Sequence, residues 1–161
     1  MDRLYSPWRY QYVTGQTPAQ GCVFCAKVND PAEDALIVHR AELNYVVVNL
    51  YPYASGHILV VPYSHVGALA DCPDATAAEM MQLVRIAEGV LREVYRAPGF
   101  NIGMNIGACA GAGVAGHIHM HMLPRWPGDA NFLTTTGETR VLPEEVIETA
   151  RKIRAAWPDS R

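Results

Sequence analysis

Residues 116–124 read GHIHMHMLP, which places His117, His119 and His121 at alternate positions. In a β-strand successive side chains point to opposite faces. We therefore predict a strand over 117–123, with the three imidazoles on one face and the apolar residues between them on the other. Burying three imidazoles without partners would be costly, so the pattern indicates chemistry. A catalytic site and a histidine-rich metal site both fit it.

The loop that precedes the histidines is made of small residues. Residues 105–113 read NIGACAGAG. Bare backbone N–H groups in glycine loops can approach phosphate oxygens closely. An imidazole beside such a loop favours nucleophilic attack on a phosphate over metal binding alone, because a neutral imidazole is available near pH 7.

Hydrophobic periodicity outside this region predicts alternating groups of strands and helices. Short apolar or β-branched runs predict strands at 35–39, 45–50, 57–61 and 100–107, and the YPYASG link at 51–56 has the length and composition of a hairpin turn. Apolar stripes predict helices over 75–96, with Asp74 or Thr76 as its cap, and over 143–157. The core face of the second helix is expected to carry Val146, Ile147, Ala150, Ile153 and Trp157. This order indicates an α+β fold with an antiparallel sheet.

Bulk composition restricts the class of protein. The chain has 161 residues, of which 50% are hydrophobic, and a net charge of −3. That length suits one domain at 21–161 after an N-terminal extension at 1–20. The charge disfavours nucleic acid as a partner, and no apolar run is long enough to cross a membrane. Without an apolar signal core at the N-terminus, the expected location is cytoplasmic.

Taken together, these motifs resemble the histidine triad (HIT) superfamily. His117 to Leu123 fits the pattern H-x-H-x-H-apolar-apolar, and residues 49–57, NLYPYASGH, resemble the N-x-x-P-x-x-x-G-H element of that superfamily. Residues 103–107, GMNIG, resemble its Asn-x-Gly strand. Residues 124–126 and 128–132 look most like the bacterial diadenosine tetraphosphate phosphorylase branch. The similarity covers roughly residues 20–157.

The resemblance implies a HIT-like fold and assigns roles to individual residues. The fold would be a half-barrel of five antiparallel strands with two helices, joined to a partner sheet in a homodimer. His119 would be the nucleophile that attacks the α-phosphorus, with His121 on the phosphate oxygens and His117 completing the triad. The ribose would lie on Asn49 and the base near Val48, Leu50 and Tyr51. The phosphates would face Asn105, Gly111, Ala112 and Gly113, and Trp126 is a candidate for stacking on a base.

The activity implied is nucleotidyl transfer from a dinucleoside polyphosphate, with an adenine nucleotide as substrate and phosphate or water as acceptor. Hydrolase branches carry Gly-Gln-Ser/Thr-Val before the first histidine, whereas residues 111–114 here read GAGV with one extra residue following. The missing polar side chains favour phosphate as the acceptor. Three alternatives stay open: a hydrolase of phosphoramidates or mononucleotide conjugates, a nucleotide-binding regulatory protein, and a non-catalytic metal-binding protein.

A cysteine pair adds a possible metal site. Cys22 and Cys25 form a C-x-x-C element, which in a cytosolic chain indicates metal or redox chemistry. Some members of the superfamily bind structural zinc with such a pair, a histidine about forty residues on and the first triad histidine. That resemblance implies a zinc site of Cys22, Cys25, His65 and His117, which suits tetrahedral zinc. The alternative is two thiols that never meet a metal. No organic cofactor is expected.

Overall fold

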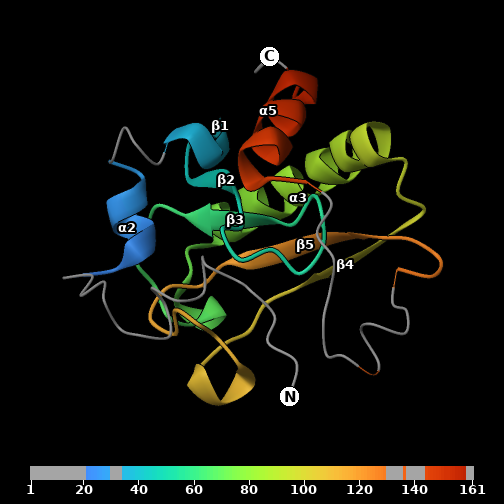
Figure 1. Cartoon of the computed structure of the whole chain (residues 1–161). Coiled ribbons are helices and arrows are strands. Elements are labelled where there is room, and N and C mark those ends of the chain that lie inside the picture. Colours follow the sequence, from blue (N-terminus) through green and yellow to red (C-terminus); the bar gives the residue numbers. More distant parts are fainter. Residues whose placement is uncertain (1–20, 30–33, 130–135, 137–143, 159–161) are drawn as a thin grey trace.

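The computed structural model describes residues 21–29, 34–129, 136 and 144–158; the expected extension at 1–20 lies outside them. At its centre is a five-stranded sheet in the order β1-β2-β3-β5-β4, in which every neighbouring pair is antiparallel (Figure 1). The strands are β1 (Ile37–Arg40), β2 (Asn44–Val48), β3 (Ile58–Pro62), β4 (Gly99–Gly103) and β5 (Met120–Arg125). The predicted α+β class with a five-stranded antiparallel sheet is confirmed.

Strands β2 and β3 form the predicted hairpin, with Tyr45 opposite Val61 and Val48 opposite Ile58. The turn between them ends at Gly56, whose φ is +77°. A Cβ at this position would lie 2.9 Å from Cγ of Pro124 and 3.0 Å from the ring of Tyr95. Backbone conformation and space therefore both require glycine here, and this tight turn delivers the next residue, His57, into the interior.

Helix α3 (Asp74–Tyr95) lies across one face of the sheet together with α5 (Val146–Ala156) (Figure 1). Its buried stripe includes Met80, Leu83, Val84, Ala87 and Leu91, as the periodicity predicts. The predicted cap is wrong: Pro73 holds the N-cap position without a side-chain hydrogen bond, and Thr76 is buried inside the first turn. The helix ends where Arg96 adopts a left-handed conformation with φ of 50°.

Helix α5 contacts α3 and the edge of the sheet formed by β1. Ala150 and Ile153 are fully buried as expected, but Ile147 is 55% exposed, because Thr149 occupies the buried position of that turn instead. The guanidinium of Arg154 donates from Nε to the carbonyl of Ile37 at 3.1 Å. The predicted start of this helix at Pro143 lies outside the described residues, and the helix itself begins at Val146.

The predicted bounds of two strands differ most from the observed ones. Strand β4 ends at Gly103 rather than at 107, and β5 begins at Met120 rather than at His117 and continues to Arg125. The N–H of Ile118 donates to the carbonyl of Val66 at 2.8 Å, so this part of the chain is tied to a loop before it enters the sheet. Alternation holds within β5, where Met122 is fully buried towards the helices and His121 lies on the opposite face.

The remaining elements are short. They are the one-turn helix α2 (Val23–Lys27) and the 3₁₀ turns η1 (Asp34–Leu36), η2 (Leu69–Asp71) and η3 (Ala108–Ala110). None of the helices in the described part of the chain has the length and apolar character that a membrane span requires.

Candidate functional site

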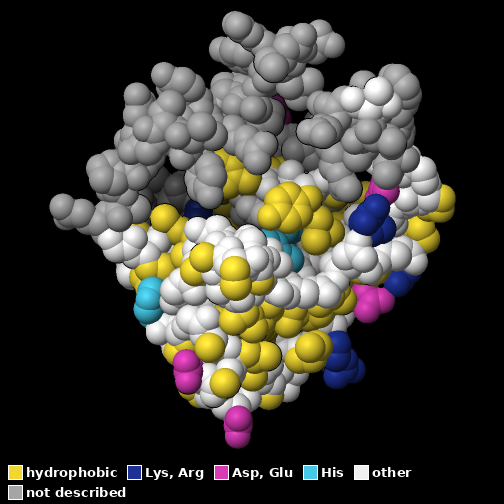
Figure 2. All heavy atoms as spheres, turned by 90° about the horizontal axis from the view of Figure 1, so that it is seen from below, with side chains coloured by type: hydrophobic (Ala, Val, Ile, Leu, Met, Phe, Trp, Pro, Cys, Tyr) yellow, Lys and Arg dark blue, Asp and Glu magenta, His cyan; other side chains and the backbone are white. Residues whose placement is uncertain are grey.

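Histidine side chains gather on the face of the sheet that lies away from α3 and α5. Figure 2 shows this face from below, with histidine atoms recessed at its centre and bordered by hydrophobic side chains. The described histidines in this region form two groups that meet in the short segment 117–121. His57, His119 and His121 make up the first group, and His65 and His117 join the two cysteines in the second.

His119 is 5% exposed, and one of its ring nitrogens is committed to the backbone. Nδ1 lies 2.9 Å from the carbonyl oxygen of His117. A carbonyl can only accept a hydrogen bond, so Nδ1 carries the proton and Nε2 keeps its lone pair. The ring lies between those of Phe24 and His121, with centroids at 4.8 and 4.9 Å. His119 therefore presents the nucleophilic form of a neutral imidazole.

A directional chain of hydrogen bonds fixes the proton on His121. The backbone N–H of Tyr53 donates to Nδ1 of His57 at 3.1 Å. The neutral His57 ring must then carry its proton on Nε2, which lies 2.9 Å from Nδ1 of His121. Nδ1 of His121 is thus an acceptor, and its Nε2 carries the proton. That Nε2 is buried and has no hydrogen-bond partner among the described residues. An unsatisfied buried donor beside a nucleophile is suited to a phosphate oxygen.

Burial keeps the three rings neutral. Burial, together with the neighbouring His121 and His119, lowers the pKa of His57 to about 3. Burial and His119 lower the pKa of His121 to about 4. Burial also lowers the pKa of His119, although the bond to the His117 carbonyl opposes the shift. At neutral pH each ring therefore holds one proton, at the nitrogen that its partners dictate.

The predicted nucleoside-binding residues surround the turn before β3. Asn49 lies beside the histidines: its amide nitrogen is 3.2 Å from Nδ1 of His57, and its oxygen accepts the N–H of Tyr51 at 3.0 Å. Leu50 and Tyr51 are 41% and 36% exposed. Val48 is only 2% exposed. Leu50 and Tyr51 therefore offer side-chain surface to a ligand, whereas the buried Val48 can only support these residues through the core.

The small-residue loop differs from its predicted form. The N–H groups of Ala110 and Ala112 donate to the carbonyl of Gly107, and that of Gly111 donates to Ala108. The expectation of bare N–H groups is therefore wrong for Gly111 and Ala112, because the 3₁₀ turn η3 uses them internally. Asn105 lies against the same turn, since a Cβ at Gly111 would be 4.0 Å from its amide nitrogen. Gly113, the third predicted loop residue, is exposed.

Trp126 lies just beyond the end of β5, five residues from His121. Its indole N–H donates to the carbonyl of Tyr95 at 3.3 Å. At the rise of a strand, five residues span roughly 17 Å. Within one chain, Trp126 is therefore not brought together with the histidines.

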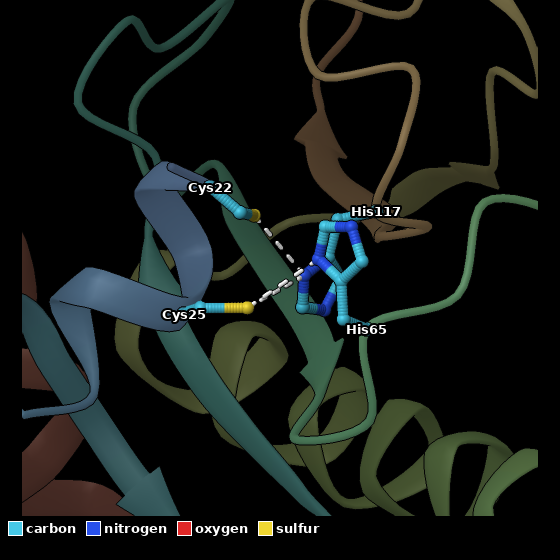
Figure 3. A group of neighbouring side chains, drawn as sticks. All are labelled: Cys22, Cys25, His65 and His117. Atoms are coloured by element: carbon cyan, nitrogen blue, oxygen red, sulfur yellow. Dashed lines mark hydrogen bonds between the residues drawn. The ribbon is translucent and has the colours of Figure 1, made fainter. Parts of the chain in front are cut away.

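The second group consists of Cys22, Cys25, His65 and His117 (Figure 3). Their four donor atoms all lie within 4.8 Å of one another. The Sγ of Cys22 is 3.2 Å from Nδ1 of His117, and that of Cys25 is 3.4 Å from Nδ1 of His65 and 3.6 Å from Nδ1 of His117. The resemblance implied this set, and the structure brings all four residues together from α2, the segment after β3 and the histidine run.

The chemistry of this set fits a zinc ion. Zn–S and Zn–N bonds of about 2.3 and 2.0 Å give a tetrahedron with S···N edges of roughly 3.5 Å, close to the observed separations. Nε2 of His117 lies 2.9 Å from the carbonyl of Pro62, so this nitrogen carries the proton and Nδ1 directs its lone pair at the sulfurs. Burial and the neighbouring Cys22 raise the pKa of the Cys25 thiol, as expected for paired sulfurs without a cation.

Sequence reasoning left three contributors without a specific role: His57, Tyr53 and Phe24. His57 binds a residue 64 positions away, so spacing alone could not link them. Tyr53 acts through its backbone N–H, and its ring lies nearly parallel to that of His121 at 5.9 Å. Phe24 lies between the two cysteines, and this position was the signal that could have placed it at the site.

Comparison with known proteins agrees with this geometry. The family model of the HIT domain matches residues 31–128. The AP-4-A phosphorylase of Mycobacterium tuberculosis is 39% identical, over 98% of this chain and 85% of that protein. The asymmetrical bis(5'-nucleosyl)-tetraphosphatase of Schizosaccharomyces pombe is 34% identical, over 58% of this chain and 50% of that protein. A zinc-bound histidine triad family protein from Mycobacterium smegmatis superposes with a TM-score of 0.70 at 34% identity, covering 85% of this chain and 93% of that one.

Proposed function

The chain belongs to the HIT domain family, and we propose that it is an enzyme that cleaves dinucleoside polyphosphates of the diadenosine tetraphosphate kind through His119. The names of the phosphorylase and tetraphosphatase relatives support this substrate class. One observation carries the assignment to a nucleophilic mechanism. The lone pair of His119 Nε2 and the unpartnered N–H of His121 Nε2 belong to adjacent rings whose centroids are 4.9 Å apart.

In the first step, the Nε2 lone pair of His119 forms a bond to the α-phosphorus, and the bond from that phosphorus to its bridging oxygen breaks. The leaving group of diadenosine tetraphosphate is ATP, whose departing oxygen carries the electron pair of that bond. The N–H of His121 Nε2 can stabilise this developing charge. The Nδ1 proton of His119 stays on the ring, where the His117 carbonyl stabilises the positive charge of the adenylylated imidazole.

In the second step, an oxygen of the acceptor attacks the same phosphorus and the N–P bond breaks, which returns the electron pair to His119. Inorganic phosphate as acceptor gives ADP, and water gives AMP. We propose phosphate. The phosphorylase relative and the GAGV sequence at 111–114, which lacks the polar side chains of hydrolase branches, support this choice.

Product analysis tests both levels of the proposal. Purified protein is incubated with diadenosine tetraphosphate, with and without phosphate, and with an adenosine phosphoramidate as a second substrate. We expect equal amounts of ADP and ATP in phosphate and slow or absent turnover without it. Equal rates in both conditions with AMP as product would reject phosphate as the acceptor. A clear preference for the phosphoramidate would reject the substrate class.

We also propose that Cys22, Cys25, His65 and His117 hold a structural zinc ion. The donor set and its spacing support a tetrahedral site, and a zinc-bound relative shares the fold. The ion would supply a cross-link between α2 and the histidine segment. Metal analysis of protein prepared without a His-tag should find one zinc per chain. Two reactive thiols at Cys22 and Cys25 and no metal would reject the site.

A homodimer formed through β4 completes the proposal. Among the described strands, β4 pairs on one side only, with β5, and its Ile102 is 46% exposed. Met81 and Ile86 on α3 are also exposed, at 50% and 38%. Edge strands pair readily with a second copy, and a two-fold axis would set β4 against itself. Light scattering should report a dimer that Ile102→Lys converts to a monomer, whereas Ile147→Lys on α5, at a position that is 55% exposed, should stay dimeric.

A further inference from the structure

Helix α2 connects the cysteine cluster to the candidate nucleophile. It has only five residues, too few for a helix to be stable by itself. Its attachments to the body include the contacts of Cys22 and Cys25 with the two histidines, and the Tyr45 hydroxyl, which donates to the carbonyl of Phe24 at 3.0 Å. The cysteine contacts are therefore among the few attachments that hold α2 in position.

The side chain that α2 sends into the core is Phe24, which is 7% exposed. Its ring lies 4.8 Å from that of His119 at an angle of 49°, and 5.5 Å from that of His117 at 69°. The hydrogen bond from Nδ1 to the His117 carbonyl fixes only one edge of the His119 ring. The tilted Phe24 ring packs against the imidazole and restricts rotation about that edge, which the hydrogen bond alone does not prevent.

We propose that Phe24 is a positioning residue for His119, which it couples to the cysteine cluster: a metal ion held by Cys22, Cys25, His65 and His117 fixes α2, α2 fixes the Phe24 ring, and that ring fixes the plane of the imidazole. The inference rests on the proposed role of His119 as the nucleophile. It goes beyond a structural role for the metal, because it makes the orientation of a reacting ring depend on whether the cluster is loaded.

The proposal predicts that loss of Phe24 lowers kcat and leaves nucleotide affinity nearly unchanged. Near-attack geometry is sensitive to displacements on the order of 1 Å, which can change rates by about 100-fold. Loosening the ring therefore lowers kcat. Nucleotide affinity stays nearly constant, because the residues proposed to bind the nucleoside, Asn49, Leu50 and Tyr51, lie in the turn before β3 and not on α2.

The test compares Phe24→Leu with Val23→Ala in zinc-loaded protein. Val23 is its neighbour on α2 but is 43% exposed, which makes it a matched control. The measurements are zinc per chain, kcat and KM with diadenosine tetraphosphate, and the ¹⁵N signals of the His119 imidazole in the absence of substrate. Those signals report the ring's proton position and its mobility without any turnover.

We expect Phe24→Leu to keep its zinc, to lose about tenfold in kcat with KM within about twofold, and to show averaged or broadened His119 signals. Wild-type protein treated with a chelator should show the same broadening. Val23→Ala should match wild type in every measurement. If Phe24→Leu loses zinc or unfolds, Phe24→Met, whose unbranched and flexible side chain can fill an irregular space, is measured instead.

Unchanged His119 signals in the zinc-loaded variant would overturn the inference. A rise in KM with unchanged kcat would also overturn it, because Phe24 would then be part of the nucleoside-binding wall. Failure of the proposed function gives a different result: His119→Ala would remain active, whereas the dependence of the His119 ring signals on Phe24 and on zinc would persist.

Discussion

The two histidine groups are built from the same side chain and meet in one five-residue segment, yet they present opposite polarity. In the cysteine cluster, the Nε2–H of His117 donates to the Pro62 carbonyl, so the Nδ1 lone pair faces the sulfurs. In the group of His57, His119 and His121, the Nε2–H of His57 donates to Nδ1 of His121, so the Nε2–H of His121 is left without a partner among the described residues. The first arrangement attracts a cation and the second an anion.

The difference shows that the partner of the second nitrogen decides what an imidazole can do. His119 illustrates the same rule, since the carbonyl of His117 leaves it with a nucleophilic lone pair. Three histidines in one H-x-H-x-H run thus acquire their proton positions from two carbonyls and one neighbouring ring. Exchanging or removing those partners should change each function separately.

Replacing His119 should have the largest effect. His119→Ala removes the one ring in the described group of His57, His119 and His121 that presents a free lone pair, so turnover should fall on the order of 10⁴-fold or more, as for other covalent catalysts. Mass spectrometry of rapidly quenched reactions should detect the adenylyl adduct in wild type and not in the variant. His39→Asn, on β1, serves as a control and should keep both activity and adduct. An active His119→Ala protein would remove the mechanistic distinction between the two groups.

Breaking the cysteine cluster should have the next largest effect, and it should act on stability. At zinc a thousandfold above its dissociation constant, binding contributes about 4 kcal/mol to folding. Cys22→Ser should lose most of this contribution, with a lower thermal midpoint and less than one zinc per chain. Cys109→Ser alters an exposed thiol outside the cluster and should leave zinc and midpoint unchanged. A Cys22→Ser protein as stable as wild type would argue that the cluster is unloaded in solution.

Replacing the partner of His121 should have a smaller effect on catalysis. His57→Leu removes the donor that holds the His121 proton on Nε2, and the loss of such an orienting partner costs on the order of tenfold to a hundredfold. His57→Gln keeps an amide N–H near the position of Nε2 and should retain more activity. The measurement is kcat for the two variants at equal occupancy with substrate. Equal losses would show that size at position 57, and not proton direction, is what matters.

The smallest effect is a dependence of stability on pH. The folded-state pKa values of His57 and His121, about 3 and about 4, lie below the ordinary value of about 6.5. The unfolded chain therefore binds more protons in this range. Each ring's contribution is complete well above pH 6.5 and is lost as the pH drops towards 4, by up to about 1.4 kcal/mol per pH unit for the deeply buried His57 and by less for the partly exposed His121. Urea unfolding at pH 7.5 and 5.5 should show this loss.

The variant His57→Gln isolates one of the two rings in that experiment. Its stability should fall less between pH 7.5 and 5.5 than that of wild type, because Gln does not titrate. Identical pH slopes for the two proteins would mean that His57 is not held neutral by burial. The comparison also cancels any loss of metal at low pH, since both proteins keep the cysteine cluster.

The sequence predicts the sheet and the histidines that lie together better than it predicts the contacts between them. Alternation correctly places His121 on the face opposite Met122. It wrongly extends the strand back to His117, because the carbonyl of Val66 holds Ile118 outside the sheet. Periodicity likewise cannot choose between Thr149 and Ile147 at the margin of an apolar stripe.

The features that could not be predicted depend on where protons and main-chain groups point. Glycine content suggests a phosphate loop, but only the three-dimensional structure shows that the N–H groups of Gly111 and Ala112 donate to carbonyls of the loop itself. The link from His57 to His121 crosses 64 residues of sequence. The resemblance to a known family implied the composition of the cysteine cluster, but not the lone-pair direction that makes it suitable for a metal.

The side chain of Arg154 has a consequence for assembly. It donates to the main-chain carbonyls of Ile37 on β1 and of Ala35 just before that strand, and β4 at the other edge of the sheet carries one large exposed apolar residue, Ile102. A sheet whose β1 edge is partly covered and whose β4 edge is open to pairing can be extended by another strand at β4 only. Joining two copies through β4 would use the open edge of each sheet and would leave the two β1 edges, each contacted by Arg154, on the outside. If the proposed dimer forms through β4, it therefore leaves no free β4 edge at which a third copy could pair.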